Sequence, residues 1–273
     1  MKTRRRIGKY WLYIPLVAMA IFYLLPMYVM LVTGFKSFDE IDLKTMWDLP
    51  RGIAFDNYLE AYTKLSPFLW NSFKMVIPAA LLSSMLGSLN GFVLAKWKFR
   101  GADVIFPIIL FGMFIPYQSI LIPLVQFMNT IGITGLPGLA MAHIIYGIPI
   151  TTLTFRNYYA SLPTELIEAG RIDGADMLGV YRWILLPISI PAFVVVLIWQ
   201  FTSAWNDFLF AVVLTGNRSW PITVALNNMA GRQIIAWNVQ MAGSFLAAVP
   251  TLLIYIFLGN YFLRGMLAGS LKG

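Results

Sequence analysis

The sequence predicts an all-α integral membrane protein with about six transmembrane helices. Of its 273 residues, 59% are hydrophobic and only 12% are charged, and the mean hydropathy is +0.73. A water-soluble domain of this length needs helices with one apolar and one polar face, whereas long stretches of this chain are apolar on every side. The composition therefore requires lipid as the solvent of most of the chain.

Six segments are long and apolar enough to cross the roughly 30 Å hydrocarbon core, which takes about 20 helical residues. These expected spans are residues 10–32, 69–95, 104–128, 136–156, 187–210 and 241–263. Residues 10–263 then form one transmembrane domain between short tails at 1–9 and 264–273. We expect the first span to be retained, because its apolar run is too long for a signal peptide and lacks a small-residue cleavage site.

The distribution of Lys and Arg predicts the orientation. An even number of spans leaves both termini on one side, and the connections on that side carry about twice as many basic residues as those on the other. Both termini are therefore expected in the cytoplasm, together with the connection 161–187. The long connections 34–68 and 211–240 are then external. They either contact an external partner or are covering loops with interfacial Trp residues.

Several function classes are excluded by what the sequence lacks. The net charge of +8 is not gathered into a basic stripe with exposed aromatics, so nucleic acid is not an expected partner. Cys is absent and His143 is the single His, which leaves no ordinary metal site and no Cys nucleophile. His143 lies in a predicted span, where a buried structural role is expected. No Gly-x-x-x-x-Gly-Lys-Ser/Thr string occurs, so no catalytic residue and no cofactor are assigned to this chain.

The connection 161–187 is amphipathic and too polar to span a membrane. Pro163 suits the first position of a helix, where its missing N–H is not needed. Glu165 and Glu168 then fall in the opening turns, where carboxylates complement the helix dipole. The sequence predicts a short helix that begins at Pro163.

A second short helix is expected after a bend. Gly174 weakens the continuation of the first helix, and Asp176 can cap a helix over residues 177–186 that Pro187 closes. A hinged helical pair of this kind can insert into a groove on another protein and can transmit force laterally. An ordinary amphipathic connector at the membrane interface has the same periodicity, so the pattern alone leaves both interpretations open.

The spacing within this connection resembles the EAA signature of ABC importer permeases. Glu168-Ala169-Gly170 is followed by Gly174 and then by a Leu-Leu-Pro ending, with the Asp-Gly-Ala core that is frequent in sugar importers. The residues that carry the resemblance are Glu168, Ala169, Gly170, Asp173, Gly174, Ala175 and Pro187. Gly170 stands where the family usually has Ala. Glycine keeps this position small but destabilises the helix by about 1 kcal/mol.

Two further stretches are similar to the maltose-type, MalG-like carbohydrate permeases. They are Trp205-Asn206-Asp207-Phe208 and the ending from Arg264-Gly265 through Ala268-Gly269 to Lys272-Gly273. The resemblance implies a type I ABC importer permease fold in which 161–187 is a coupling-helix loop. It implies as partners a second, MalF-like permease, an ATPase dimer that binds ATP and Mg, and an extracytoplasmic sugar-binding protein. It also implies a bacterial or archaeal cell membrane.

Two alternatives to an ABC permease stay open at this point. A secondary transporter driven by an ion gradient usually shows midplane acids, or broken helices arranged as inverted repeats, and the spans show little of either. A non-transporting membrane scaffold is the other alternative.

The substrate pathway is expected to use neutral polar side chains, because each hydroxyl of an uncharged sugar needs a donor or an acceptor once its water is removed. The candidates are Asn90, Gln118, Asn206 and Asp207. The alternative is that the second permease supplies the main contacts.

Small residues recur every fourth position in the second span, at Ser83, Gly87, Gly91 and Ala95. Such a stripe lets two helix backbones approach closely. It fits either a moving interface with a second permease or a static contact within this chain.

Overall fold

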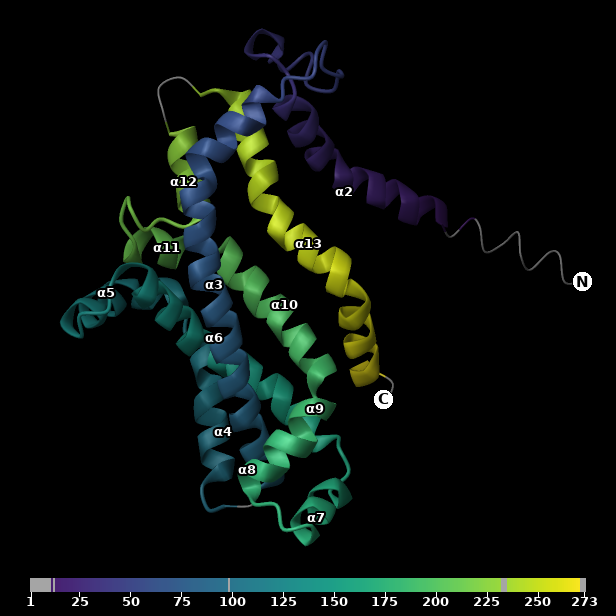
Figure 1. Ribbon diagram of the computed structural model, residues 1–273, viewed down its shortest axis with the longest axis vertical. Helices are drawn as coiled ribbons and strands as arrows, with labels where there is room; N and C mark the ends of the chain where they lie inside the picture. The colour runs from purple at the N-terminus through teal and green to yellow at the C-terminus, as the bar shows by residue number, and fades with distance from the viewer. Residues whose placement is uncertain (1–10, 12, 98, 232–234, 271–273) are drawn as a thin grey trace, which may run out of the picture. The chain divides into compact units, whose positions relative to one another are not determined.

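The structure is a computed structural model that describes residues 11, 13–97, 99–231 and 235–270, with residues 262–270 described by their backbone only. Within these residues all regular secondary structure is helical. The chain forms two compact units, Met1–Pro67 with Ala225–Val249, and Phe68–Val224 with Pro250–Gly273. We call them unit 1 and unit 2 (Figure 1).

The described helices account for the expected spans. They are α2 (Tyr13–Gly34), α3 (Asp56–Lys96), α4 (Ala102–Phe111), α5 (Leu121–Thr130), α6 (Gly135–Ala160), α10 (Ile190–Asn206) and α13 (Trp237–Ser270). Four helices are long and apolar enough to cross a membrane, and the number rises to six if two bent helix pairs each form one span. The predicted all-α membrane fold with about six spans is confirmed. The expected tail 1–9 lies outside the described residues, as do residues 271–273.

Helix α3 is longer than its apolar segment. It begins at Asp56 rather than at residue 69, so about the last third of the expected external connection 34–68 belongs to this helix. The added turns carry Glu60 and Lys64, which form an ion pair one turn apart. Hydropathy locates only the lipid-soluble part of a helix, and charged turns that continue it are invisible to such a search.

The other expected connections also contain helix. Residues 211–240 include most of α11 (Leu209–Leu214) and all of α12 (Ile222–Ala230). Helix α13 continues to Ser270, past the point at 264 where a tail was expected. The apolar run ends there, but no proline follows it, and the helix continues through Gly265 and Gly269.

The third span is broken at Pro116. The helical segments on either side of it, Ala102–Phe114 and Tyr117–Thr130, meet at 89°. Ile115, directly before the proline, is extended as that position requires. Its carbonyl accepts a hydrogen bond from the Tyr146 hydroxyl on α6. A neighbouring helix therefore satisfies a backbone group that the break leaves free.

The small-residue stripe of α3 packs against α6 within unit 2. A Cβ on Gly87 would lie 2.8 Å from the backbone carbon of Thr151, and one on Gly91 would lie 2.6 Å from the backbone nitrogen of Arg156. The Thr151 hydroxyl donates to the carbonyl of Ser83 at 3.0 Å. The two backbones touch, so the stripe serves a static contact inside the chain rather than an interface with another subunit.

In unit 1, a pair of buried amides joins three helices. Asn57 donates to the carbonyls of Gly34 at 2.9 Å and Lys36 at 2.8 Å. Asn238, at the start of α13, donates to the Asn57 side chain at 2.9 Å. The ends of α2, α3 and α13 are fixed to one another by these bonds.

The segment between α2 and α3 is ordered by its own polar contacts. Lys36 is 2% exposed and donates to the carbonyl of Thr45 at 2.6 Å. Glu40 accepts from the backbone N–H of Arg51 at 2.8 Å and from the hydroxyl of Ser37 at 2.7 Å. These donors, the Arg51 N–H first, hold the pKa of Glu40 below its usual value because they favour the ionised carboxylate. The segment is a defined structure rather than an open loop.

Candidate functional site

The connection 161–187 folds as a helix, a bend and a second helix, as predicted. Helix α7 (Glu165–Ile172) begins two residues after Pro163, the predicted start, with Thr164 at its N-cap. The bend is at Gly174, whose φ of +85° lies in the left-handed region. Ala175 donates to the carbonyl of Gly170 at 2.9 Å, a Schellman-type helix end. Glycine suits this position because an L side chain is strained there.

The second helix is capped as expected but ends differently. Asp176 accepts from the backbone N–H of Gly179 at 2.7 Å at the start of α8 (Met177–Val180). The chain then continues through a π-helical turn, η4 (Tyr181–Leu185), into α9 (Leu186–Ile188). The prediction that Pro187 closes the helix is wrong, because this proline lies in the first turn of α9, where its missing N–H is tolerated.

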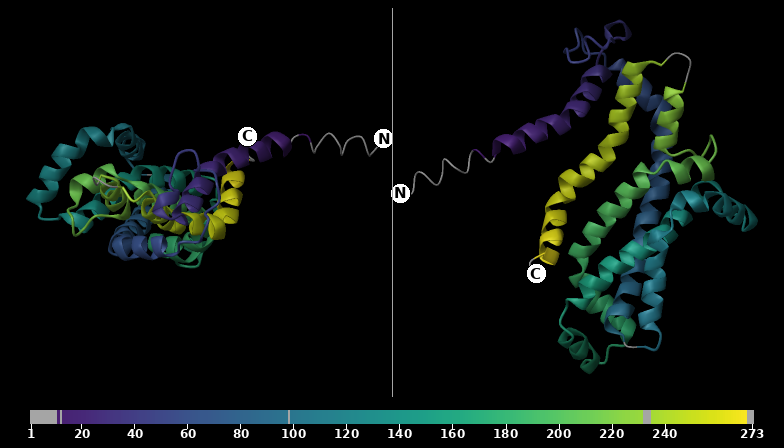
Figure 2. Two further views of the ribbon diagram at one scale, coloured as in Figure 1. Left: turned by 90° about the horizontal axis from the view of Figure 1, so that it is seen from above. Right: turned by 180° about the vertical axis from the view of Figure 1, so that it is seen from behind.

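The change of direction comes at Ser189. The segments Met177–Ile188 and Ile190–Asn206 meet there at 77°. Figure 1 shows α7 and α8 at one end of unit 2, and the view from behind in Figure 2 agrees.

One side of α7 is exposed. Glu168, Ala169 and Asp173 are all solvent-exposed, and Ile172 is 86% exposed. Among the described residues, no cation lies at ion-pair distance from Glu168 or Asp173. This face of α7 thus presents two carboxylates and one exposed isoleucine.

The other side of α7 is buried against η4. Ile167 is 6% exposed and belongs to the apolar core of this end of unit 2. A Cβ on Gly170 would lie 2.5 Å from Cδ1 of Ile184 and 3.4 Å from Cγ2 of Val180. Gly170 therefore leaves the space that Cδ1 of Ile184 occupies. The spacing of the sequence motif did not reveal this contact.

We expect Gly170→Ala to stabilise the native background by less than the helix propensity of Ala alone would give, because the added methyl group must displace Cδ1 of Ile184. In an Ile184→Val background, which lacks Cδ1, the same change should stabilise by about 1 kcal/mol through helix propensity. Thermal unfolding of both single variants and the double variant in detergent measures this coupling. An equal effect of Gly170→Ala in the two backgrounds would contradict it.

The base of the connection is attached to the end of α3. The Lys96 ammonium donates to the carbonyl of Leu162 at 2.6 Å. The Arg171 guanidinium lies 5.2 Å from the centre of the Trp97 ring, a cation–π contact. The connection is thus held to the end of α3 at two points, one before α7 and one within it.

Asp207, one of the four pathway candidates, is engaged within unit 2. Its carboxylate lies 3.4 Å from Nε2 of His143 and accepts from the backbone N–H of Ala211 at 3.1 Å. The side chains of His143 and Asp207 are 11% and 10% exposed. Asp207 thus joins α6 to the start of α11, and His143 has the nearly buried position expected of it.

Of the other three candidates, Asn206 is the direct sequence neighbour of Asp207, whereas Asn90 lies apart from it. Gln118 and Asn206 are exposed, whereas Asn90 is half-buried with its amide 3.5 Å from the hydroxyl of Thr152. Thr152 lies nine residues beyond His143 on α6, about 13 Å along a helix. Asn90 is therefore separated along α6 from the contact between His143 and Asp207.

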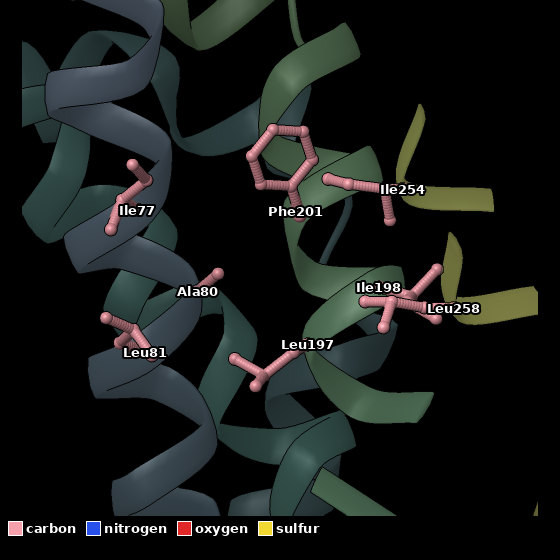
Figure 3. Close-up of a pocket in the computed structure, with 8 residues that line it drawn as sticks. All are labelled: Ile77, Ala80, Leu81, Leu197, Ile198, Phe201, Ile254 and Leu258. Carbon is pink, nitrogen blue, oxygen red and sulfur yellow. The ribbon is translucent and has the colours of Figure 1, made fainter. Parts of the chain in front are cut away.

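An apolar cavity of about 170 Å³ lies between α3, α10 and α13 within unit 2 (Figure 3). Its lining residues are Ile77, Ala80, Leu81, Leu197, Ile198, Phe201, Ile254 and Leu258. None of these side chains forms hydrogen bonds, so the cavity cannot replace the water around a sugar. None of the four pathway candidates lines it.

The helical connection lies in a region that matches a known protein family. Residues 83–267, which include it, match the family described as "binding-protein-dependent transport system inner membrane component". The chain belongs to this family. It is an ABC importer permease, and the ion-gradient-driven alternative is not supported.

Relatives of this permease extend over nearly its whole length. It is 45% identical to a probable ABC transporter permease protein of Pyrococcus horikoshii, over 98% of this chain and 100% of that protein. It is 36% identical to a xylose/arabinose import permease protein of Haloferax volcanii, over 96% and 92% of the two chains. It is 32% identical to a glucose import system permease protein of Saccharolobus solfataricus, over 96% and 95%.

The fold of the permease is also that of solved importers. A chain of a bacterial ABC transporter involved in the import of the acidic polysaccharide alginate matches with a TM-score of 0.79 at 21% identity, over 95% of this chain and 98% of that one. A chain of the MetNI methionine transporter in an inward-facing conformation matches with a TM-score of 0.58 at 17% identity. This likeness supports the predicted permease fold.

Proposed function

We propose that this permease carries a neutral mono- or oligosaccharide across a bacterial or archaeal cell membrane by alternating access. An extracytoplasmic binding protein delivers the sugar, and a second, MalF-like permease completes the membrane pathway. An ATPase dimer, which binds ATP and Mg, drives the cycle. Both termini of this permease are cytoplasmic.

The observation that carries the coupling role is the exposed face of α7. Glu168 and Asp173 are available for ion pairs with a partner, and Ile172 offers an apolar contact between them. The side chain of Ala169 is small and projects little from this face. Gly174 and Ala175 form the bend that follows α7. Such a face performs no chemistry, so its role is to hold a partner and to transmit the partner's movement.

The attachment of the connection supports the same role. Helix α7 contacts η4 through Ile167 and Gly170, and its base is fixed to the end of α3 through Lys96 and Arg171. Movement of an ATPase docked on α7 would thus act on at least two membrane helices. Pro187, inside α9, belongs to the rigid part of this path.

The sugar class is supported by the relatives, which include permeases for xylose and arabinose, for glucose and for α-glucosides. Gln118 and Asn206 are exposed neutral amides that suit hydroxyl groups. Asp207 lies against His143 and accepts a hydrogen bond from the backbone N–H of Ala211, so we assign it a positioning role. Asn90 faces Thr152 and is the least supported of the four as a sugar contact.

Reconstitution in proteoliposomes tests this proposal. The permease, its second permease and its ATPase are combined with the cognate binding protein and a panel of monosaccharides, oligosaccharides and polyol phosphates. We expect one sugar with its binding protein to stimulate ATP hydrolysis and to accumulate inside the vesicles. Absence of any ligand-dependent stimulation would favour a scaffold, and uptake without ATPase would overturn the coupling role.

A further inference from the structure

Four buried hydroxyl groups form a continuous chain at the inner side of the connection, within unit 2. Tyr181 donates to Ser88 at 3.0 Å, and Ser88 and Tyr159 share a bond of 2.6 Å. Tyr159 donates to Ser189 at 3.1 Å. The four side chains belong to residues that are 0–4% exposed. We call this set the hydroxyl chain.

The direction of the bonds follows from counting protons. Each hydroxyl has one proton, and the protons of Tyr181 and Tyr159 go to Ser88 and Ser189. Ser88 must therefore donate to Tyr159. Ser189 donates to the carbonyls of Leu185 at 2.8 Å and Leu186 at 3.0 Å. The hydroxyl chain is thus fully satisfied, and bonds aligned in one direction strengthen one another in a core of low polarity.

The hydroxyl chain begins on the π-helical turn, and its last member donates back to that turn. It starts at Tyr181, the first residue of η4. Its last member, Ser189, donates to the carbonyl of Leu185, the last residue of η4. Between these points it passes through Ser88 of α3 and Tyr159 of α6. π-Helical turns leave backbone groups loosely paired and often mark functional positions. The hydroxyl chain holds this turn against two membrane helices.

Its last member lies at the sharpest bend of this segment. Ser189 is the residue at which the helical direction changes by 77°. Apolar side chains enclose the bonds, and Phe92 of α3 stacks on Tyr181 with ring centres 5.7 Å apart. Water has little access to this core and cannot replace a hydrogen bond that is lost. Each bond of the hydroxyl chain therefore contributes to the stiffness of residues 181–189.

We propose that the hydroxyl chain is the rigid joint between the connection and the membrane helices, with Tyr181 and Ser88 as positioning residues for coupling. This inference rests on the proposed coupling role of α7. With the hydroxyl chain intact, a displacement of α7 and α8 also moves α3 and α6. With a bond removed, the π-helical turn and the bend at Ser189 absorb part of the displacement.

The test uses the complete transporter in proteoliposomes and measures sugar transported per ATP hydrolysed. Tyr181→Phe keeps the ring stack on Phe92 and removes only the hydroxyl, so a folded protein is expected. We expect the ratio to fall by about fivefold, as for the loss of one buried hydrogen bond, while ATP hydrolysis continues. Ser88→Ala should have at least this effect.

The matched control is Tyr28→Phe, which removes a tyrosine hydroxyl that donates to the carbonyl of Trp47 at 2.9 Å in unit 1, outside the hydroxyl chain. Its ratio should stay near that of the native protein. The double variant Ser88→Ala/Tyr181→Phe should be no worse than Ser88→Ala alone, because both changes break the same path. Hydrogen exchange of residues 181–189 in the complex should rise in both single variants.

The outcomes separate this proposal from the function on which it rests. If the native transporter shows no sugar-stimulated ATPase, both proposals fail. If the native transporter couples normally and Tyr181→Phe and Ser88→Ala keep the same ratio, the rigid joint is overturned and the coupling role stands. An equal fall in Tyr28→Phe would also overturn it, because loss of any tyrosine hydroxyl would then have the same effect.

Discussion

Glu168→Lys combined with Gly174→Asp is expected to lower ATP-driven uptake by about 100-fold or more. The first change reverses a charge on the exposed face of α7. The second places a side chain on a backbone whose φ is +85° and adds a third carboxylate beside Asp173 and Asp176. Uptake into proteoliposomes and the amount of ATPase retained during purification measure the loss.

Gly216→Asp provides the matched control, because it makes the same chemical change at an exposed glycine with no atoms within 4 Å of an added Cβ. Its uptake should be unchanged. Gly174→Asn should fall between the two, since Asn tolerates the left-handed region and adds no charge. If the double variant takes up sugar with full coupling, α7 is not the docking element.

Gly91→Ala is expected to destabilise the protein by about 3 kcal/mol. The added Cβ would lie 2.6 Å from the backbone nitrogen of Arg156 and 2.9 Å from the backbone carbon of Phe155. Neither atom is the end of a flexible side chain, so α3 and α6 must separate. Separation would loosen packing along their shared surface, where Gly87 makes a similar contact. The midpoint of thermal unfolding in detergent measures the effect.

The control is Gly259→Ala, a glycine within the membrane helix α13 that has no atoms within 4 Å of an added Cβ. This change should be neutral or slightly stabilising, because Ala favours the helix. Equal midpoints for the two variants would show that the α3–α6 contact is not as close as the structure places it.

The fold class was predictable because a bilayer imposes a simple rule. Hydrophobic length alone identifies a spanning helix, and the described helices agree with about six such segments. The limits of the helices were not predictable by this rule. Asp56 begins α3 well outside the apolar segment, because water-exposed turns are stabilised by charged pairs such as Glu60 with Lys64 rather than by lipid.

The site was predictable where its determinants are local. The bend at Gly174 and the cap at Asp176 depend on residues within a few positions, and both are confirmed. The end of the second helix was misplaced although its signal is local. Pro187 was expected to stop it, but the bend is at Ser189, two residues before Pro191 in the first turn of α10, whose ring and missing N–H do not allow the preceding helix to continue.

By itself the sequence determined the membrane class, the hinged helical pair and the permease family, because hydrophobic length, helix caps and motif spacing are all encoded over short distances. Only the tertiary structure decided what the small residues of α3 contact, why Gly170 faces Ile184 and how Asp207 pairs with His143. It also brought together the hydroxyl chain, whose members lie up to 93 positions apart between bonded partners. Contacts of this kind depend on which helices become neighbours, and helical periodicity carries no information about that choice.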